Sequence, residues 1–300
     1  ELTDVPLIVR SRVMPIILFT LDNSGSMAWE TITGSDAKAE YNSGKTNRAF
    51  YSPSYNKLYY NPTITYLPAV KYDSDATTFT SSRGASPAAA ALVNPYSGTS
   101  KVNLTEKCWG TPDIDLPLYN STSFAKVDSC PNSSTKYYSK LYARYAFYYS
   151  WEGTGNPNGG DTQNNDSSYK RVEIVPAVST YPRAASRTDC GIEIACTYEQ
   201  EIQNFANWFT YYRTRILTAK SSLGLAFSAL NEKSRVGFST INDNSSNDNT
   251  SGANFIPLAE FDSTQKLTWY SQVYGISPNG GTPLVTALDR AGQYYATGKM

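Results

Sequence analysis

One stretch near the start of the chain decides the fold, PIILFTLDNSGS at residues 15–26. Its first part is a continuous apolar run. A run without alternation is typical of a strand that is buried on both faces of a mostly parallel sheet. The run ends at Asp22, where small polar residues predict a tight turn. We therefore expect an α/β protein whose first strand delivers polar side chains to the carboxyl edge of the sheet, where such sheets bind ligands.

Helix and strand signals continue from residue 197 onwards. The sequence TYEQ at 197–200 fits a capping box, in which Thr and Gln side chains satisfy free amide groups at a helix start. Behind it, apolar residues recur at steps of three and four, which predicts one helix of about thirty residues. The pattern then predicts strands at 236–241 and 255–261, the second broken by Pro257, and a short helix at 265–274.

A last helix is predicted after GGTP at 280–283, where Pro283 suits a first helical position. Its apolar stripe comprises Leu284, Ala287, Leu288, Ala291 and Tyr295. Strands that alternate with helices in this order indicate an α/β architecture with one large interruption.

The interruption is residues 28–189, a stretch rich in Ser, Thr, Asn, Pro and Gly that holds 17 of the 24 tyrosines. Alternation over 144–151 predicts a strand, and 169–175 reads as its antiparallel return strand. The tyrosine content argues against disorder and favours ordinary packing. We predict three segments, which are the first strand with its loop at 1–27, a loop- and β-rich insertion at 28–189, and the continued α/β domain at 190–300.

Composition excludes several classes of function. The chain has 26 Lys plus Arg and 26 Asp plus Glu, whereas nucleic-acid-binding proteins normally carry a basic excess. It has no histidine, which removes the usual general base and the His-based zinc sites. A surface of Ser, Thr, Asn and Tyr suits a secreted or surface-exposed binding protein better than a cytosolic enzyme. No apolar run approaches the ~20 residues of a membrane span, so no transmembrane segment is expected.

Four cysteines, an even number, permit three disulfide pairings. Proximity in the sequence favours Cys108 with Cys130 and Cys190 with Cys196. The alternatives are four reduced, buried thiols, or a zinc site that would need all four thiolates together.

Asp22, Ser24 and Ser26 have the spacing D-x-S-x-S at the carboxyl end of the first strand. One carboxylate and two hydroxyls offer only oxygen, which suits Mg²⁺ and its near-octahedral shell. These groups carry too little charge to satisfy the ion, so waters or an acidic group of a partner must complete the shell. The metal would then join the protein to that partner. The alternative is that Asp22 and Ser24 only cap a helix.

The D-x-S-x-S turn and the Gly-Gly-Thr loop at 280–282 resemble the von Willebrand factor A family and its metal-ion-dependent adhesion site. The resemblance implies a Rossmann-like, mostly parallel sheet flanked by helices. It implies that Ser24 and Ser26 bind a divalent cation directly, and that Asp22 and Thr282 bind it directly or through water. The expected ion is Mg²⁺, with Mn²⁺ or Ca²⁺ as alternatives. Thr282 could instead be a helix cap.

The same resemblance predicts that this chain supplies only the first strands of the family sheet, which would be incomplete at its carboxyl-terminal end. The fifth family position, an aspartate after the next strand, is expected beyond Met300. We therefore expect the chain to be a piece of a longer protein.

Three segments narrow the resemblance to the PilY/PilC-type proteins of bacterial type IV pili, namely LDNSGSM at 21–27, YYNPTITYLP at 59–68 and FANWFTYYRTR at 205–215. That group implies a pilus-tip location outside a Gram-negative cell, reached through the periplasm, and a carboxyl-terminal β-propeller. It also implies contact with minor pilins and roles in pilus biogenesis, surface attachment and twitching motility. Arg213 and Arg215 lie two apart on the predicted helix, and we assign them no binding role.

The leading hypothesis is a non-enzymatic, metal-dependent adhesion module that binds an acidic group on a surface ligand. One alternative is a structural cap of the pilus without metal-dependent binding. A second is a lectin-like domain whose exposed aromatic side chains bind carbohydrate. A metal-assisted hydrolase using Asp113 and Asp115 is disfavoured, because their Pro-flanked surroundings do not suggest a tuned carboxylate pair.

Overall fold

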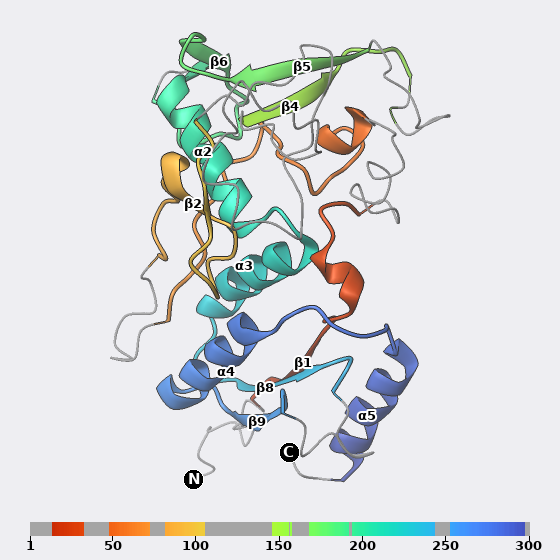
Figure 1. Cartoon of the computed structure of the whole chain (residues 1–300). Coiled ribbons are helices and arrows are strands. Elements are labelled where there is room, and N and C mark those ends of the chain that lie inside the picture. The colour runs from red at the N-terminus through yellow and green to blue at the C-terminus, as the bar shows by residue number, and fades with distance from the viewer. Residues whose placement is uncertain are drawn as a thin grey trace, which may run out of the picture. The chain divides into compact units, whose positions relative to one another are not determined.

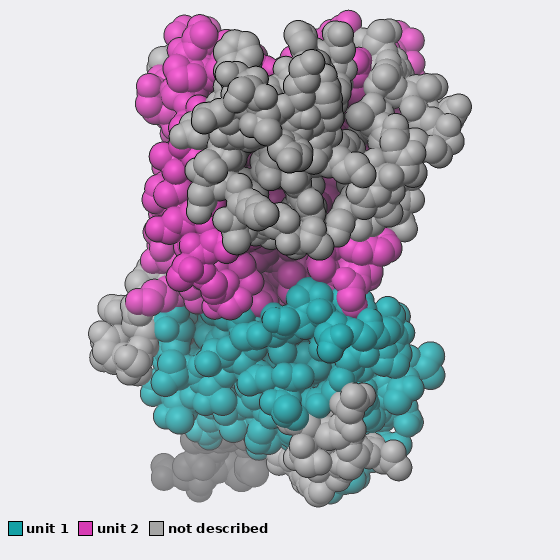
Figure 2. Space-filling model, in the orientation of Figure 1, with its two compact units in different colours: residues 1–24, 72–79, 226–300 teal, residues 25–71, 80–225 magenta. Residues whose placement is uncertain are grey.

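The computed structural model describes residues 14–32, 48–72, 82–105, 146–155, 157, 168–191, 194–243 and 253–297. The chain forms two compact units, shown in separate colours in Figure 2. Unit 1 comprises residues 1–24, 72–79 and 226–300, and unit 2 comprises residues 25–71 and 80–225. The fold is mixed α/β, and its elements are labelled in Figure 1. In the described part of the chain, no helix is both long enough and apolar enough to cross a membrane.

Unit 1 contains a three-stranded sheet with the strand order β1-β8-β9. The strands are β1 (Ile16–Leu21), β8 (Arg235–Thr240) and β9 (Ile256–Glu260). Strand β1 runs parallel to β8, with Leu21 opposite Thr240 at the carboxyl end, so the loops that follow both strands emerge at the same edge. Strand β9 is antiparallel to β8. The predicted first strand and the strand at 236–241 are therefore confirmed.

The second predicted strand is continuous rather than broken at Pro257. Pro257 sits where two residues of β9 oppose the single residue Gly237 of β8, in a β-bulge. Proline is tolerated at a bulge of an edge strand because no ladder hydrogen bond is required there. A side chain at position 237 would clash, since a Cβ atom would lie 2.8 Å from the carbonyl oxygen of Ile256.

Helix α4 (Ser263–Gly275) confirms the short helix predicted at 265–274. The Asp262 carboxylate caps it by accepting a hydrogen bond from the amide of Gln265 at 2.9 Å. Its Trp269 is fully buried and stacks on Phe227, with ring centroids 4.3 Å apart. Phe238 of β8 is also fully buried and meets the Trp269 ring edge-on, so aromatic side chains form the core of unit 1.

Helix α5 (Leu284–Ala296) follows the Gly-Gly-Thr loop as predicted, but its buried face differs from the predicted apolar stripe. Leu284 and Leu288 are 57% and 76% exposed, whereas Arg290 and Tyr294 are buried. Arg290 donates to main-chain carbonyls just after β8, and the Tyr294 hydroxyl accepts from the amide of Leu258. These polar groups turn inward because they satisfy main-chain atoms at the strand ends and at the bulge.

Unit 2 holds helix α2 (Tyr198–Tyr211) and most of helix α3 (Arg215–Ser228), whose last residues fall in unit 1. The prediction of a single thirty-residue helix is wrong. The chain leaves helical geometry at Tyr212, whose φ is −135°, and Thr214 begins the next helix by accepting a hydrogen bond from the amide of Leu217. Thr214 is thus the signal for a helix start. It is easily overlooked because the apolar periodicity of the sequence continues across the break.

The rest of unit 2 is built from short elements. Strands β4 (Ala146–Trp151) and β5 (Tyr169–Ile174) form the predicted antiparallel hairpin. Two smaller antiparallel pairs are β2 (Ala91–Leu92) with β3 (Lys101–Val102) and β6 (Thr180–Pro182) with β7 (Ala195–Thr197). The 3₁₀ turns are η1 (Gly25–Ala28), η2 (Arg48–Tyr51) and η3 (Ala88–Ala90).

Tyrosines supply much of the core of unit 2. Tyr59, Tyr60 and Tyr148 are buried together with Phe205 and Trp208 of α2. The ring centroids of Tyr59 and Trp208 lie 4.8 Å apart, and those of Tyr60 and Phe205 lie 4.9 Å apart. The expectation that most tyrosines pack is therefore confirmed for these residues.

Candidate functional site

The D-x-S-x-S turn begins at the carboxyl end of β1. Asp22 is partly buried, and its Oδ1 accepts a hydrogen bond from the amide of Ser24 at 2.8 Å. Its Oδ2 has no hydrogen-bonding partner among the described residues. Ser24 is 1% exposed. Ser26 lies in η1, the first element of unit 2.

Three asparagines join this turn to the Gly-Gly-Thr loop within unit 1. The Asn23 carbonyl accepts from the amide of Asn279 at 2.7 Å, and its side-chain Oδ1 accepts from the amide of Asn242 at 3.1 Å. The Asn242 side chain then donates to the carbonyls of Asn279 and Gly281, at 3.0 and 2.6 Å. Two segments more than 250 residues apart in the sequence are thereby held together.

Gly280 has a backbone φ of +78°, a conformation that favours glycine. A Cβ atom there would also lie 3.1 Å from Oδ1 of Asn242, so glycine lets the loop approach this side chain closely. Two residues later, Thr282 is exposed. Pro283 is the N-cap residue of α5, and no side-chain hydrogen bond caps this helix. The alternative that Thr282 is a side-chain helix cap is therefore wrong.

The residues predicted to hold a cation offer one carboxylate and three hydroxyls. This donor set fits a hard divalent ion that keeps part of its water shell. Asp22 Oδ1 is occupied in the local turn, but its Oδ2 and the exposed hydroxyl of Thr282 have no hydrogen bonds within the described residues. No group of three or more His, Cys, Asp or Glu side chains suited to a metal occurs in that part of the chain. A cation here would thus depend on hydroxyls.

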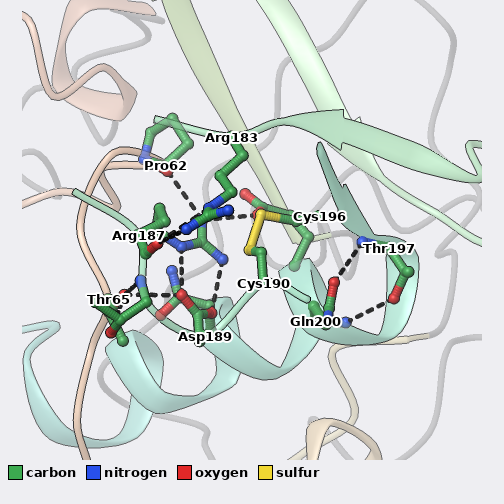
Figure 3. The surroundings of a disulfide bond; sticks show 12 residues. Pro62, Thr65, Arg183, Arg187, Asp189, Cys190, Cys196, Thr197 and Gln200 are labelled. Carbon is green, nitrogen blue, oxygen red and sulfur yellow. Dashed lines mark hydrogen bonds and ion pairs between the residues drawn. A yellow bond between two sulfur atoms is a disulfide. The ribbon is translucent and has the colours of Figure 1, made fainter. Parts of the chain in front are cut away.

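The cysteine pair Cys190 and Cys196 forms a disulfide, as predicted, with the two Cα atoms 4.9 Å apart. Cys108 and Cys130 lie outside the described residues. Figure 3 shows the disulfide next to the start of α2, where Thr197 and Gln200 form the predicted capping box. The disulfide therefore ties Cys190, in the loop before β7, to β7 itself, which leads directly into this helix.

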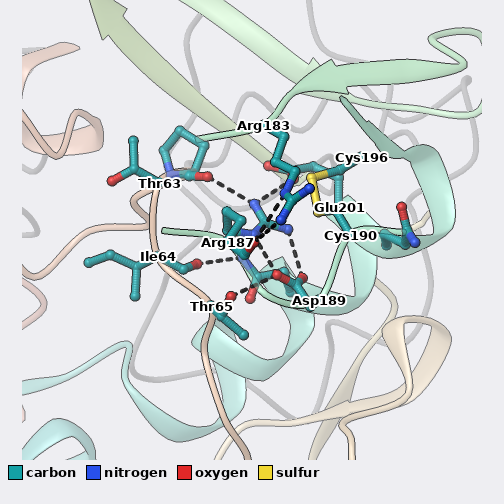
Figure 4. A network of polar contacts seen from close by, with 12 residues as sticks. Thr63, Ile64, Thr65, Arg183, Arg187, Asp189, Cys190, Cys196 and Glu201 are labelled. Atoms are coloured by element: carbon teal, nitrogen blue, oxygen red, sulfur yellow. Dashed lines mark hydrogen bonds and ion pairs between the residues drawn. A yellow bond between two sulfur atoms is a disulfide. The ribbon is translucent and has the colours of Figure 1, made fainter. Parts of the chain in front are cut away.

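A buried ionic network lies beside the Cys190–Cys196 disulfide in unit 2 (Figure 4). The side chains of Arg187 and Glu201 are fully buried and form an ion pair at 2.9 Å. Arg187 also donates two hydrogen bonds to the carboxylate of Asp189, at 2.7 and 2.8 Å, and one to the carbonyl of Pro62. The Tyr60 hydroxyl donates to the other oxygen of Glu201 at 2.7 Å. The network thus joins the 59–68 segment, the segment just before Cys190, and α2.

Burial and pairing shift the ionisation of this network in opposite directions. Burial raises the pKa of Glu201, and the nearby Arg187 offsets only part of that effect. Burial alone would also raise the pKa of Asp189, but the hydrogen bonds from Arg187 and Thr65 outweigh it and hold the pKa below its usual value. Burial would lower the pKa of Arg187, yet its carboxylate partners raise it, so the guanidinium stays charged.

Asparagines of α2 bind the main chain of the 59–68 segment as a neighbouring strand would. Asn204 accepts from the amide of Tyr66 at 2.8 Å and donates to the carbonyl of Ile64 at 2.8 Å. Asn207 donates to the carbonyl of Tyr66 at 3.0 Å. Sequence reasoning did not single out these residues. Neither residue lies on the predicted apolar stripe, so helical periodicity offered no signal that these amides would be buried.

Arg213 and Arg215, to which we assigned no binding role from the sequence, both hold the segment that follows η1. Arg213 forms an ion pair with Glu30 at 2.8 Å. The Arg215 guanidinium donates to the carbonyl of Thr31 and lies 5.0 Å from the ring centroid of Trp29. The helix break between them lets both side chains reach this segment, which a continuous helix would not have allowed.

The chain is similar to the type IV pilus biogenesis factor PilY1 of Pseudomonas aeruginosa. It is 30% identical over 296 residues to the protein of strain UCBPP-PA14, covering 97% of this chain and 21% of that protein. For strain PAK the identity is 28% over 292 residues, covering 96% of this chain and 21% of that protein. The match shows homology, and the chain spans about a fifth of the length of these curated relatives. No protein-family model and no solved structure matches it.

Proposed function

We propose that this chain is part of a PilY1-related type IV pilus biogenesis factor and that it carries a metal-dependent adhesion site. Similarity to PilY1 over nearly the whole chain supports the first part. One observation carries the second part. The asparagine bonds between the D-x-S-x-S turn and the Gly-Gly-Thr loop join the two segments that such a site requires.

We assign unit 1 to the von Willebrand factor A type. The parallel β1–β8 pair, with its polar turn at the carboxyl end, supports this assignment. The ligands of the cation are Asp22, Ser24, Ser26 and Thr282, and Ser26 enters this set from the sequence spacing alone. Mg²⁺ is the preferred ion, with Mn²⁺ or Ca²⁺ as alternatives.

A bound cation would supply the positive charge that these residues lack, and would accept an acidic group of a partner. The residues of the chain prepare the site. Asp22 holds Ser24 in the turn through Oδ1, which leaves Oδ2 for the ion. The partners we propose are minor pilins and an acidic ligand on a host or abiotic surface. The proposed location is the pilus tip, outside a Gram-negative cell.

The structural-cap alternative is supported by the buried network of unit 2, which needs no metal to hold its segments together. The lectin-like alternative gains no support from the described residues, whose exposed large apolar side chains are all aliphatic.

Replacement of Ser24 and Ser26 by alanine separates adhesion from the structural-cap role. In cells that carry the variant, we expect normal piliation with reduced surface attachment, and chelation of divalent cations should reduce wild-type attachment to the same level. Ser271→Ala, at an exposed position of α4, is the matched control and should change neither. Normal attachment by the Ser24→Ala, Ser26→Ala variant would support the structural-cap role and contradict metal-dependent adhesion.

A further inference from the structure

A polar cavity of about 270 Å³ lies beside the two loops in unit 1. Its polar lining residues among those described are Asn23, Asn242, Asn254, Ser277 and Asn279. Asn23 stands between Asp22 and Ser24 in the turn, and Gly280, which also lines the cavity, precedes Thr282 by two residues. The cavity therefore borders both segments of the proposed adhesion site.

The cavity wall is held in place by hydrogen bonds that leave some lining groups unused. Asn242 bonds to Asn23, Asn279 and Gly281, and Asn254 accepts from Gln272 at 2.9 Å. A wall fixed in this way keeps its shape before any ligand arrives, which lowers the entropy cost of binding.

Three side chains keep hydrogen-bonding capacity. Asn23 is 6% exposed, and its amide nitrogen Nδ2 has no partner among the described residues, because only its oxygens are bonded. The Asn279 side chain is also unpaired there, since its bonds come from the main chain. The Ser277 hydroxyl likewise has no partner in the described part of the chain. The cavity thus offers both donors and acceptors.

Among the residues that the structure describes, the lining contains no ionisable side chain. A carboxylate or an ammonium group entering the cavity would lose hydration without meeting an opposite charge, which is costly. A carboxamide is neutral and carries one acceptor and two donor hydrogens, so it matches free asparagine and serine groups. The volume holds a single side chain of that kind together with water.

We propose that this cavity binds the carboxamide side chain of an asparagine or glutamine in a peptide ligand, next to the acidic residue that the cation would bind. The proposal rests on the proposed function for the role of the acidic residue. The carboxamide site itself depends only on the asparagine wall, so the two can be tested separately.

Small probes test the cavity without metal. Butyramide, butyrate and butylamine share an alkyl chain but are neutral, negative and positive, and each would be titrated into the full chain while amide signals are followed by nuclear magnetic resonance. We expect butyramide to shift the side-chain signals of Asn23 and Asn279 with a millimolar dissociation constant, as is usual for so small a ligand. Butyrate and butylamine should bind at least fivefold more weakly.

Asn279→Leu should abolish the butyramide shifts, since it fills the cavity with an apolar side chain and keeps the main-chain bonds to Asn23 and Asn242. Ser277→Ala, which removes one hydroxyl only, should weaken binding. Asn231→Leu is the control, because Asn231 is exposed and lies outside the cavity. Equal shifts by all three probes, or unchanged binding by Asn279→Leu, would overturn the proposal.

A second titration compares the peptides Gly-Asp-Asn-Gly and Gly-Asp-Leu-Gly with and without Mg²⁺. We expect Mg²⁺ to strengthen binding of both, and the Asn peptide to bind more tightly in either condition. A preference for Asn without any effect of Mg²⁺ would keep the cavity proposal and contradict the metal site. An effect of Mg²⁺ without a preference for Asn would keep the metal site and overturn the cavity proposal.

Discussion

The two units of the chain are stabilised in different ways. In unit 1, the main chains of β1, β8 and β9 bond to one another in a ladder, and aromatic side chains fill the core behind it. In unit 2, the sheets are two-stranded, and many segments are joined by side chains that bond to the main chain of another segment. Trp208, for example, donates to the carbonyl of Leu58 at 3.0 Å.

This difference explains where the chain places its polar residues. A ladder satisfies its own main chain, so the loops at its carboxyl edge can keep oxygen and amide groups for a ligand. Unit 2 joins segments outside its two-stranded sheets, where its tyrosines, asparagines and Arg187 satisfy buried main-chain groups and charges. The polar residues of unit 1 are therefore candidates for binding, and those of unit 2 for holding the chain together.

Alkaline pH should produce the largest difference between the units. The tyrosines whose pKa burial raises in unit 2 are Tyr59, Tyr60, Tyr66, Tyr148, Tyr181, Tyr198, Tyr211 and Tyr212. In unit 1, the described tyrosine with a raised pKa is Tyr270. Because their pKa is higher in the folded state, these residues ionise first in the unfolded state above pH ~10. Stability therefore falls as pH rises, by at most about 1.4 kcal/mol at pH ~11 for each fully buried tyrosine.

We expect a cooperative rise of tyrosinate absorbance above pH ~10, together with loss of near-ultraviolet circular dichroism. Brief proteolysis followed by mass spectrometry should place the first cleavages in unit 2. Gradual ionisation without loss of structure would show that the tyrosines are not locked in place.

Replacement of Arg187 by Met should destabilise unit 2 by about 3–5 kcal/mol, because it leaves the buried charge of Glu201 without its partner. Arg171→Met is the matched control. It breaks an ion pair with Glu173 whose side chains are 23% and 40% exposed, and should cost at most about 1 kcal/mol. Urea unfolding gives both values. In Arg187→Met, the amides of 59–68 and α2 should lose protection from hydrogen exchange. Equal losses of stability in the two variants would contradict the proposed role of the buried network in unit 2.

Joint replacement of Cys190 and Cys196 by serine should have the smallest effect of the three changes. The disulfide closes a short loop, with a sequence separation of 6, and the chain-entropy estimate gives about 2 kcal/mol. Thermal unfolding measures the loss, and hydrogen exchange should place it at the start of α2. Loss of protection in β1 or β8 would show that the disulfide supports more than its own surroundings.

Local patterns predicted much of the fold. The alternation of residues predicted the β4–β5 hairpin, and the Thr197–Gln200 pair predicted the start of α2. Both predictions succeeded because each feature depends on residues that are close in the sequence. The break at Tyr212 was missed because the apolar periodicity continues across it. The buried face of α5 was missed because Arg290 and Tyr294 turn inward to bond with distant main-chain atoms. Of the candidate site, the sequence named the residues of both loops, but not the asparagines that join them, because those bonds link distant parts of the chain.

The central claim, a cation bound at the turn after β1, is tested most directly by calorimetric titration of the purified protein with Mg²⁺. Asp22→Asn is the decisive comparison, because asparagine keeps an oxygen to accept from the Ser24 amide but removes the negative charge. The proposal predicts saturable binding by the wild-type protein and its loss in Asp22→Asn. Absence of binding by the wild-type protein, or equal binding by both, would contradict it.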